Sequence, residues 1–245
     1  MIINKPSGLT VHPAPSVKGP TLVDWLRHKG VSLSTLSGEE RHGIVHRIDK
    51  ETSGALVIAK TNEAHLALSR QLEDKSMGRY YLAIIDQPLK ESCFVEKKIT
   101  RNPRNRIKMM AADTGREAKS AFLKIATAQN RPWELIAAKL FTGRTHQIRV
   151  HLASIGRHIL ADTTYGFKSK KDKISRIMLH AYIIYFIHPV TGKKIFKRAP
   201  IPKDFENVLG SAFVKEEIDE KTAPDTLIDA FDTLCERLQH PKYRA

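Results

Sequence analysis

The spacing of apolar residues along the chain predicts both strands and helices. Short apolar runs rich in β-branched and aromatic residues predict strands, and apolar residues that recur every three or four positions predict amphipathic helices. The predicted strands start at Ile2 and Ile3 and continue at 55–59, 81–85, 118–125, 133–141, 178–187 and 195–197. The predicted helices lie around 22–26, over 62–75 and over 145–155, closed by Gly30, Gly78 and Gly156. The pattern is typical of the mixed α+β class.

The composition changes after Pro202. An acidic patch comprises Glu216, Glu217, Asp219 and Glu220, and a helix is predicted over 225–238. The apolar stripe of this helix consists of Leu227, Phe231, Leu234 and Leu238, which share one face. We expect one domain over 1–209, with the segment 210–245 packed on it or beside it.

Several classes of protein are excluded at this stage. The chain of 245 residues has no apolar run close to the roughly 20 residues of a membrane span. Its first residues lack the plan of a signal peptide, so we expect a cytoplasmic protein with no membrane partner. Cys93 and Cys235 stand far apart and alone, which supports neither a disulfide framework nor a zinc site.

The charge of the chain points to a polyanion. Lysine and arginine number 41 against 26 acidic residues, a net charge of +15, and nucleic acid is the leading candidate partner. One basic cluster comprises Lys97, Lys98, Arg101, Arg104, Arg106 and Lys108. A second comprises Lys168, Lys170, Lys171, Lys173 and Arg176. We expect both to be loops that contact RNA; the alternative is two solvated surface loops.

A polar motif at 46–54 interrupts apolar sequence. Ile44 and Val45 before it and 55–59 after it are predicted to be buried strands, so the motif must lie where these strands reach the surface. Asp49 lies beside Arg47, and a nearby positive charge keeps a carboxylate ionised. Asp49 is therefore a candidate nucleophile or base. The alternative is a turn in which Asp49 bonds only its own backbone.

A second polar motif at 142–151 passes from a strand to a helix through Gly143. Helical spacing places Arg149 beside the apolar row of this helix, so its charge points toward the protein and needs an anionic partner. Asp49 is one candidate, and a purely structural carboxylate is the alternative. Arg144, at the start of the helix, is freer to meet phosphate or substrate.

Metal and cofactor sites find little support. The pairs His42 with His46 and His146 with His151 do not fit a zinc site. The first pair has no acidic ligand nearby, and the second pair would point to different faces of its helix. The sequence has no G-x-S-x-G, Walker A or G-x-G-x-x-G motif. We therefore expect chemistry that uses carboxylate and arginine, with no metal and no cofactor.

Together the two polar motifs resemble the signature motifs of the RluA family of RNA pseudouridine synthases. They read GIVHRIDKETSG at 43–54 and GRTHQIRVH at 143–151. Four shorter segments follow the order of the family: NKPSG at 4–8, TVHP at 10–13, RYYLA at 79–83 and DTTYG at 162–166. The resemblance covers about 1–209. It implies the pseudouridine synthase catalytic fold, a mixed, mainly antiparallel sheet with flanking helices and basic loops.

The family resemblance implies roles for single residues. Asp49 would be the nucleophile, Tyr81 would stack on the target uracil and move protons, and Arg149 would pair with Asp49. Arg47 would fill the place of the flipped base. Further RNA contacts are expected from Arg144, His146, Lys97, Lys98, Arg101, Arg104 and Arg106. Whether Asp49 forms an adduct at the sugar or supports a glycal-like route stays open.

The first motif and the basic segment around Arg101 look most like the RluD-like subgroup, which implies large-subunit ribosomal RNA as substrate. We expect a monomer. No S4 RNA-binding domain precedes Met1, although many RluD-like enzymes carry one, so either the chain lacks this domain or the sequence is a truncated or late-started product. Two alternatives remain open: the same reaction on transfer RNA, and a non-catalytic RNA-binding factor in ribosome assembly.

Overall fold

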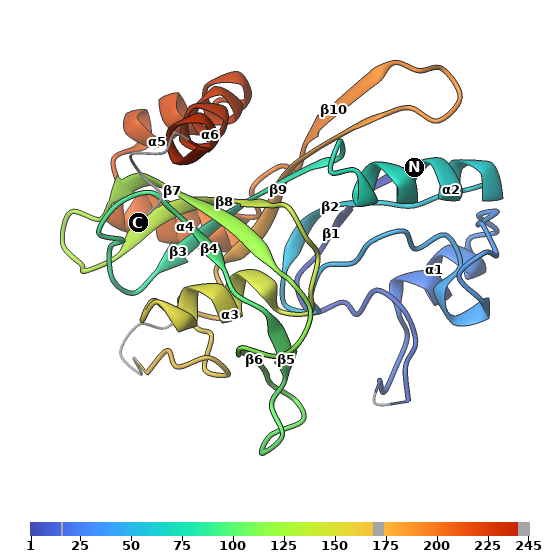
Figure 1. Ribbon diagram of the computed structural model, residues 1–245, viewed down its shortest axis with the longest axis horizontal. Helices are drawn as coiled ribbons and strands as arrows, with labels where there is room; N and C mark the ends of the chain where they lie inside the picture. Colours follow the sequence, from blue (N-terminus) through green and yellow to red (C-terminus); the bar gives the residue numbers. More distant parts are fainter. Residues whose placement is uncertain (16, 169–173, 240–245) are drawn as a thin grey trace. The chain divides into compact units, whose positions relative to one another are not determined.

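The computed structural model describes residues 1–15, 17–168 and 174–239. The chain forms two compact units (Figure 1). Unit 1 comprises Met1–Arg79 and Leu179–Ile201, and unit 2 comprises Tyr80–Met178 and Pro202–Ala245. Each unit therefore contains two separate stretches of the chain.

The sheet of unit 1 combines antiparallel and parallel pairs. Strand β1 (Ile2–Lys5) is antiparallel to β2 (Ser53–Val57), and β2 is parallel to β9 (Leu179–Ile187). Strand β10 (Lys194–Arg198) returns antiparallel to β9. At Gly54 the two parallel strands come very close, because a Cβ there would lie 2.2 Å from the backbone oxygen of Ala181. Gly54 also has a φ of +116°, which other residues rarely adopt.

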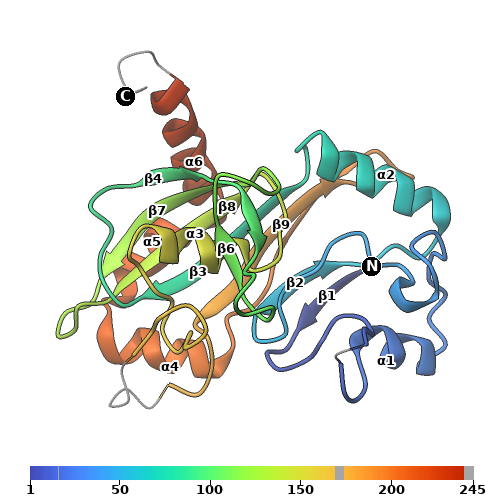
Figure 2. The same cartoon turned by 60° about the horizontal axis from the view of Figure 1, so that its bottom comes forward.

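Two helices belong to the N-terminal part of unit 1. Helix α1 (Leu22–His28) starts with a capping box formed by Thr21 and Asp24. The Thr61 side chain caps α2 (Asn62–Glu73) by accepting a hydrogen bond from the amide of Ala64. Leu68 of α2 belongs to the core cluster that covers Ala55 and Val57 of β2. Figure 2 shows α2 and α1 on opposite sides of β1 and β2. A short 3₁₀ helix, η1 (Glu39–Arg41), follows α1.

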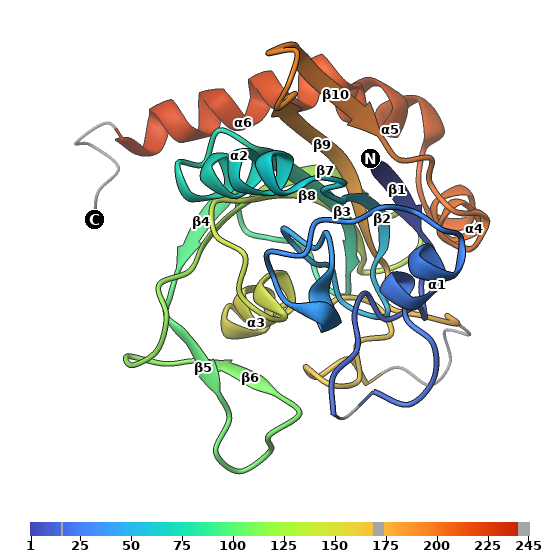
Figure 3. The same cartoon turned by 90° about the vertical axis from the view of Figure 1, so that its right-hand side faces the viewer.

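The sheet of unit 2 is antiparallel. Its order is β3 (Gly78–Ile85), β8 (Glu134–Leu140), β7 (Lys119–Thr127) and β4 (Cys93–Glu96), with a bulge in β7 between Lys124 and Ala126. The first two residues of β3 belong to unit 1. Strands β5 (Ile99–Arg101) and β6 (Met109–Ala111) form a separate hairpin, which projects from one end of unit 2 in Figures 1 and 3.

The helices of unit 2 are α3 (Gln147–Ser154), α4 (Lys203–Ala212), α5 (Lys215–Thr222) and α6 (Pro224–Gln239). Helices α5 and α6 lie at the end of unit 2 away from the β5–β6 hairpin (Figure 3). Leu227, Phe231 and Leu234 of α6 are buried, and the ring of Phe231 lies 5.3 Å from that of Tyr80 in β3. The side chain of Leu238, the fourth residue of the predicted stripe, lies outside the described residues.

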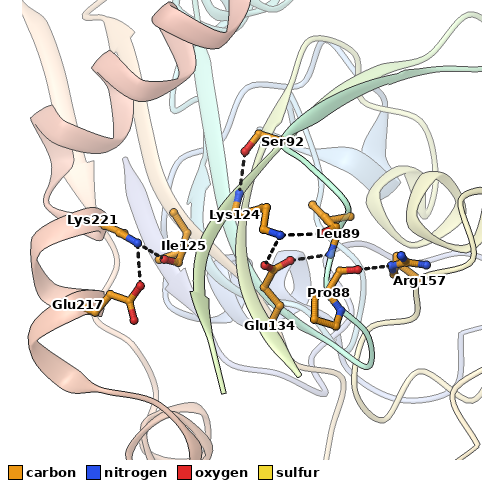
Figure 4. A network of polar contacts seen from close by, with 9 residues as sticks. All are labelled: Pro88, Leu89, Ser92, Lys124, Ile125, Glu134, Arg157, Glu217 and Lys221. Atoms are coloured by element: carbon orange, nitrogen blue, oxygen red, sulfur yellow. Dashed lines mark hydrogen bonds and ion pairs between the residues drawn. The ribbon is translucent and has the colours of Figure 1, made fainter. Parts of the chain in front are cut away.

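A buried carboxylate connects β7 and β8 to the loop after β3 (Figure 4). Glu134 is 1% exposed, accepts the amide of Leu89 at 2.8 Å and lies 3.4 Å from the Lys124 ammonium. Lys124 also donates to the carbonyl of Leu89 at 2.6 Å, so the buried charge is paired and hydrogen-bonded. On the neighbouring helix, Lys221 joins Glu217 to the carbonyl of Ile125.

The α+β class and the mixed, mainly antiparallel sheet are confirmed, and most predicted elements are present within two or three residues of their expected ends. The domain limits expected at 1–209 and 210–245 stay a prediction. The two compact units are a separate description of the chain and divide it at other positions.

Two local predictions were wrong. Ile44 and Val45 are not a strand: Ile44 makes one isolated bridge to Ile58. Instead, the His46 ring accepts the amide of Val57, where a neighbouring strand would otherwise accept it. Gly78 does not close a helix, since α2 ends at Glu73. Gly78 starts β3, where a Cβ would lie 1.9 Å from the ring of Tyr185.

The predicted loop at 97–108 was also only partly right. Residues 99–101 form strand β5, the loop covers 102–108, and strand β6 begins directly after it at Met109. No element was predicted from the sequence at the positions of η1, β4, β5, β6, α4 and α5.

Candidate active site

Asp49 lies in a loop of unit 1 that precedes β2. Along this loop the side chains alternate: Arg47 is exposed, Ile48 is buried at 4% exposure, and Asp49 is half-buried. Partial desolvation of its guanidinium, which lies against His12, lowers the pKa of Arg47, and the nearby Asp49 carboxylate opposes this shift. The structure thus brings Asp49 and Arg47 together at the surface, with Ile48 holding the loop to the core.

A buried lysine anchors the Asp49 loop. Lys5 is fully buried, and its ammonium donates to the carbonyls of Pro6 at 2.7 Å, Leu9 at 2.8 Å and Lys50 at 3.0 Å. Two more hydrogen bonds join the same segments. The Gly8 amide donates to the carbonyl of Lys50, and the Ser7 hydroxyl donates to the carbonyl of Glu51. A buried ammonium is costly unless it is hydrogen-bonded, so these carbonyls fix where Lys50 and therefore Asp49 lie.

His12 holds the side chain of Arg47. Its Nδ1 lies 2.7 Å from the carbonyl of Pro13, and its Nε2 lies 2.7 Å from Nη1 of Arg47. A carbonyl can only accept and a guanidinium can only donate, so the ring is neutral with its proton on Nδ1. Burial lowers the pKa of His12, and the positive charge of Arg47 adds to this effect. The Arg47 guanidinium therefore has a fixed position beside the loop.

His46 has a structural role at the start of the loop. Its Nε2 accepts the Val57 amide at 3.0 Å. Burial, with a smaller contribution from Arg79, lowers the pKa of His46 to about 3. The ring is thus neutral and connects the loop to β2.

Arg149 lies in α3 of unit 2 and is 4% exposed. Its Nε and Nη2 donate to the two carboxylate oxygens of Asp162 at 2.7 and 2.9 Å. This two-point geometry is the strongest pairing available to an arginine, and it offsets the cost of burying both charges. Arg149 thus has a carboxylate partner that the sequence prediction did not name. The expected pairing of Arg149 with Asp49 stays a prediction.

Two other predicted residues of unit 2, His146 and Arg144, lie at the start of α3. His146 is the N-cap of α3, with a left-handed φ of +56°, so the helix starts two residues later than predicted. Nδ1 of His146 lies 2.7 Å from the Tyr165 hydroxyl. Arg144 is half-buried, and its Nε donates to the carbonyl of Glu117. Tyr81 lies in β3 opposite Ala138 and is 5% exposed.

The basic residues predicted to bind RNA gather on the β5–β6 hairpin and just before it. Arg101, Arg104 and Arg106 are exposed, as is Lys97, whereas Lys98 pairs with Glu117 at 3.4 Å. Asn102 shapes the tip of the hairpin, because its side-chain oxygen accepts the amides of Arg104 and Asn105.

The predicted RNA contact of the second basic cluster has less support from the structure. Lys170, Lys171 and Lys173 lie outside the described residues, while Lys168 is exposed. Arg176 donates to both carboxylate oxygens of Asp204 at 2.6 and 3.0 Å, so this arginine has a structural partner.

Sequence analysis missed the supporting residues Lys5, His12 and Asp162. Each lies in a short segment that was recognised as resembling the family but was given no role. The available signal was a charged or polar side chain inside such a segment. Its partner could not be inferred, because the partner is distant in sequence in two of the three cases.

Within 1–15, 17–168 and 174–239, no group of three or more histidine, cysteine, aspartate or glutamate side chains is arranged to hold a metal ion. In the same ranges, no helix is both long enough and apolar enough to cross a membrane.

Comparisons with known proteins agree with the fold and with the motifs. A family model described as RNA pseudouridylate synthase matches residues 1–154. An uncharacterized RNA pseudouridine synthase of Helicobacter pylori strain J99 is 50% identical over 239 residues, which cover 94% of this chain and 72% of the relative. The ribosomal large subunit pseudouridine synthase D of Zymomonas mobilis is 42% identical over 217 residues, covering 84% and 68%.

Solved structures extend the likeness of the fold. The human RNA pseudouridylate synthase domain containing 1 is 22% identical, with a TM-score of 0.69, and the match covers 94% of this chain and 89% of that one. The fold and the motifs thus define an RNA-modifying enzyme of the pseudouridine synthase class. The chain belongs to the RluA family of RNA pseudouridine synthases, and within that family it is RluD-like.

Proposed function

We propose that this enzyme converts specific uridines of large-subunit ribosomal RNA into pseudouridine, with Asp49 as the nucleophile. The observation that supports this role most is the Asp49 loop. Lys5 fixes its backbone through Lys50, and His12 fixes the neighbouring arginine. A nucleophile needs such a defined position, because small errors in the placement of reacting groups cost large factors in rate.

The reaction rearranges one nucleotide. The N1–C1′ bond of uridine breaks, the free uracil turns, and C5 bonds to C1′. C5 then loses its proton and N1 carries one, so nothing is added to or removed from the RNA. Asp49 would attack the sugar directly or stabilise the charge that develops while a proton leaves C2′.

Chemistry on a base requires the base to leave its stack. Arg47 is an exposed residue whose guanidinium is held by His12, so it is suited to fill the empty space and to stack on the neighbouring bases. The flipped uracil would stack on Tyr81.

Arg149 would orient Asp49 through a second carboxylate contact. A guanidinium has five N–H donors in a planar arrangement and can bind more than one carboxylate. In Arg149, Nε and Nη2 donate to Asp162. The positive charge would also help to keep Asp49 ionised.

The choice of ribosomal RNA rests on the relatives and on charge. Relatives at 36 to 42% identity are named ribosomal large subunit pseudouridine synthase D. The exposed arginines of the β5–β6 hairpin would contact phosphates, which give affinity and position more than base identity. Transfer RNA remains the competing substrate. The monomeric state and the cytoplasmic location stay predictions.

The role of Asp49 is tested by Asp49→Ala, with Glu51→Gln as the matched control in the same loop. We expect Asp49→Ala to abolish conversion of an unmodified large-subunit ribosomal RNA transcript and to keep the RNA affinity of the wild type. Glu51→Gln should keep both, because Glu51 contributes its backbone carbonyl to the loop. Equal loss of binding and conversion in Asp49→Ala would show that Asp49 is mainly structural.

A further inference from the structure

We infer that Tyr165 is a positioning residue that links the RNA-binding β5–β6 hairpin to Arg149. Tyr165 follows Asp162 in the turn at 162–166, and its amide donates to the Asp162 carboxylate at 3.3 Å. The side chain contacts the hairpin at Met109 and two residues of the α3 segment, the N-cap His146 and Arg149. The inference rests on the proposed role of Arg149 and adds a residue to that site.

The ring of Tyr165 defines one side of the Arg149 guanidinium. The guanidinium carbon lies 5.0 Å from the centre of the ring, within the range of a cation–π contact. Asp162 binds two nitrogen atoms of the same guanidinium. One turn of the chain therefore supplies both a carboxylate and an aromatic face to Arg149, and together they fix its orientation.

The hydroxyl of Tyr165 connects the hairpin to α3. It accepts the amide of Met109, the first residue of β6, at 2.9 Å and lies 2.7 Å from Nδ1 of His146. A hydrophobic cluster supports the same link, because Met109, Ala111 and Tyr165 pack against Ile99 and Val150. Val150 is the neighbour of Arg149 in α3.

His146 carries a backbone strain that the Tyr165 contact helps to maintain. A left-handed conformation at a residue other than glycine costs about 1 kcal/mol or more and persists only when neighbours hold it. Movement of Met109 would shift the Tyr165 hydroxyl and so change its contact with His146. The first turn of α3, where Arg149 lies, would change with it.

The hairpin tip is the part that RNA would move or order. Arg104 and Arg106 are exposed there, and Met109 follows after only two residues. Phosphate binding at the tip would fix the position of β6. Tyr165, which contacts both Met109 and Arg149, would then hold Arg149 in a fixed position as well. RNA contact at the hairpin thus favours the catalytic arrangement of Arg149.

Hydrogen exchange tests this link without requiring turnover. The probe is an unmodified large-subunit ribosomal RNA transcript, added to the full chain of the wild type, Tyr165→Phe, and the double variant Arg104→Ala with Arg106→Ala. In the wild type we expect RNA to slow amide exchange in 146–152 by at least about fivefold. In Tyr165→Phe the hairpin should still be protected, but 146–152 should no longer respond. The double variant should lose both responses.

A response of 146–152 that is equal in the wild type and Tyr165→Phe would overturn the inference. So would a response that persists in the double variant. Conversion by the same proteins is measured separately: we expect Tyr165→Phe to lower the single-turnover rate about tenfold while RNA affinity stays within about twofold. A wild type that binds the transcript but converts nothing would contradict the proposed substrate, and the exchange result would still decide the role of Tyr165.

Discussion

His46 and Arg47 are neighbours, yet their side chains enter opposite environments. The His46 ring is buried, neutral and bonded to the backbone of β2. The Arg47 side chain is exposed and held by His12. The two residues together explain how a loop can present a charged side chain at the surface and remain firmly attached to the fold.

The burial of His46 makes stability depend on pH. Its pKa is about 3 in the folded state and 6.5 in the reference state, so the unfolded chain binds the extra proton between these values. The stability that depends on a neutral His46 is therefore fully present well above pH 6.5, and it is lost progressively as the pH decreases toward 3. We expect His46 alone to cost about 2 kcal/mol in the free energy of unfolding at pH 5 relative to pH 7. Denaturant unfolding of the wild type and His46→Gln at both pH values measures this difference.

His28 provides the control, since it is exposed at the end of α1. His28→Gln should keep the pH dependence of the wild type, and His46→Gln should reduce it. Equal pH dependence in all three proteins would show that His46 does not remain neutral in the folded state.

Single residues also show which contacts could not be predicted from the sequence. The sequence placed Arg149 on the inner side of a helix and required an anionic partner for it, and the structure provides Asp162. The partner could not be chosen from the sequence, because a pairing depends on which segments the fold brings together. The same limit applies to Lys5, whose contact with Lys50 spans 45 positions.

At the level of elements, local periodicity predicted the longer helices and strands well. Helix α2 and strand β9 have strong patterns and lie within a few residues of their predicted bounds. Elements such as α5 and β5 were missed because they are short and polar, and tertiary contacts rather than local preference stabilise them. Helix α5 is attached to β7 by Lys221, a contact that no local pattern reveals.

The parallel pair of β2 and β9 depends on one glycine. Gly54 has a positive φ, and a side chain there would collide with the backbone of Ala181. We expect Gly54→Ala to lower the free energy of unfolding by about 3 kcal/mol. Gly210→Ala is the control, because Gly210 lies exposed in α4 with open space around it and should become slightly more stable. Similar unfolding curves for Gly54→Ala and the wild type would contradict the close approach of the strands.

Over the whole molecule, charge is distributed unevenly. The chain carries a net charge of +15, while α5 and α6 are rich in acidic residues. Within unit 2 these acidic helices lie at the end away from the basic hairpin (Figures 1 and 3). We therefore expect RNA to be attracted to the hairpin end of the unit and repelled from the helical end.

This charge distribution predicts a steep effect of salt on RNA binding. Removal of Arg104 and Arg106 should reduce the slope of log affinity against log salt by about 1.5, because each phosphate contact contributes somewhat less than one. Replacement of Lys203 and Lys215, which are exposed in α4 and α5, removes the same charge and should leave the slope unchanged. A wild-type affinity that does not change with salt would contradict the RNA-binding role of the hairpin.

The most direct test of the central claim is a map of pseudouridines in ribosomal and transfer RNA. The map is made from cells that lack this gene and carry either the wild type or Asp49→Asn in its place. We predict that one or more pseudouridines of large-subunit ribosomal RNA disappear without the gene and return only with the wild type. An unchanged map of large-subunit ribosomal RNA, or full recovery with Asp49→Asn, would contradict the account.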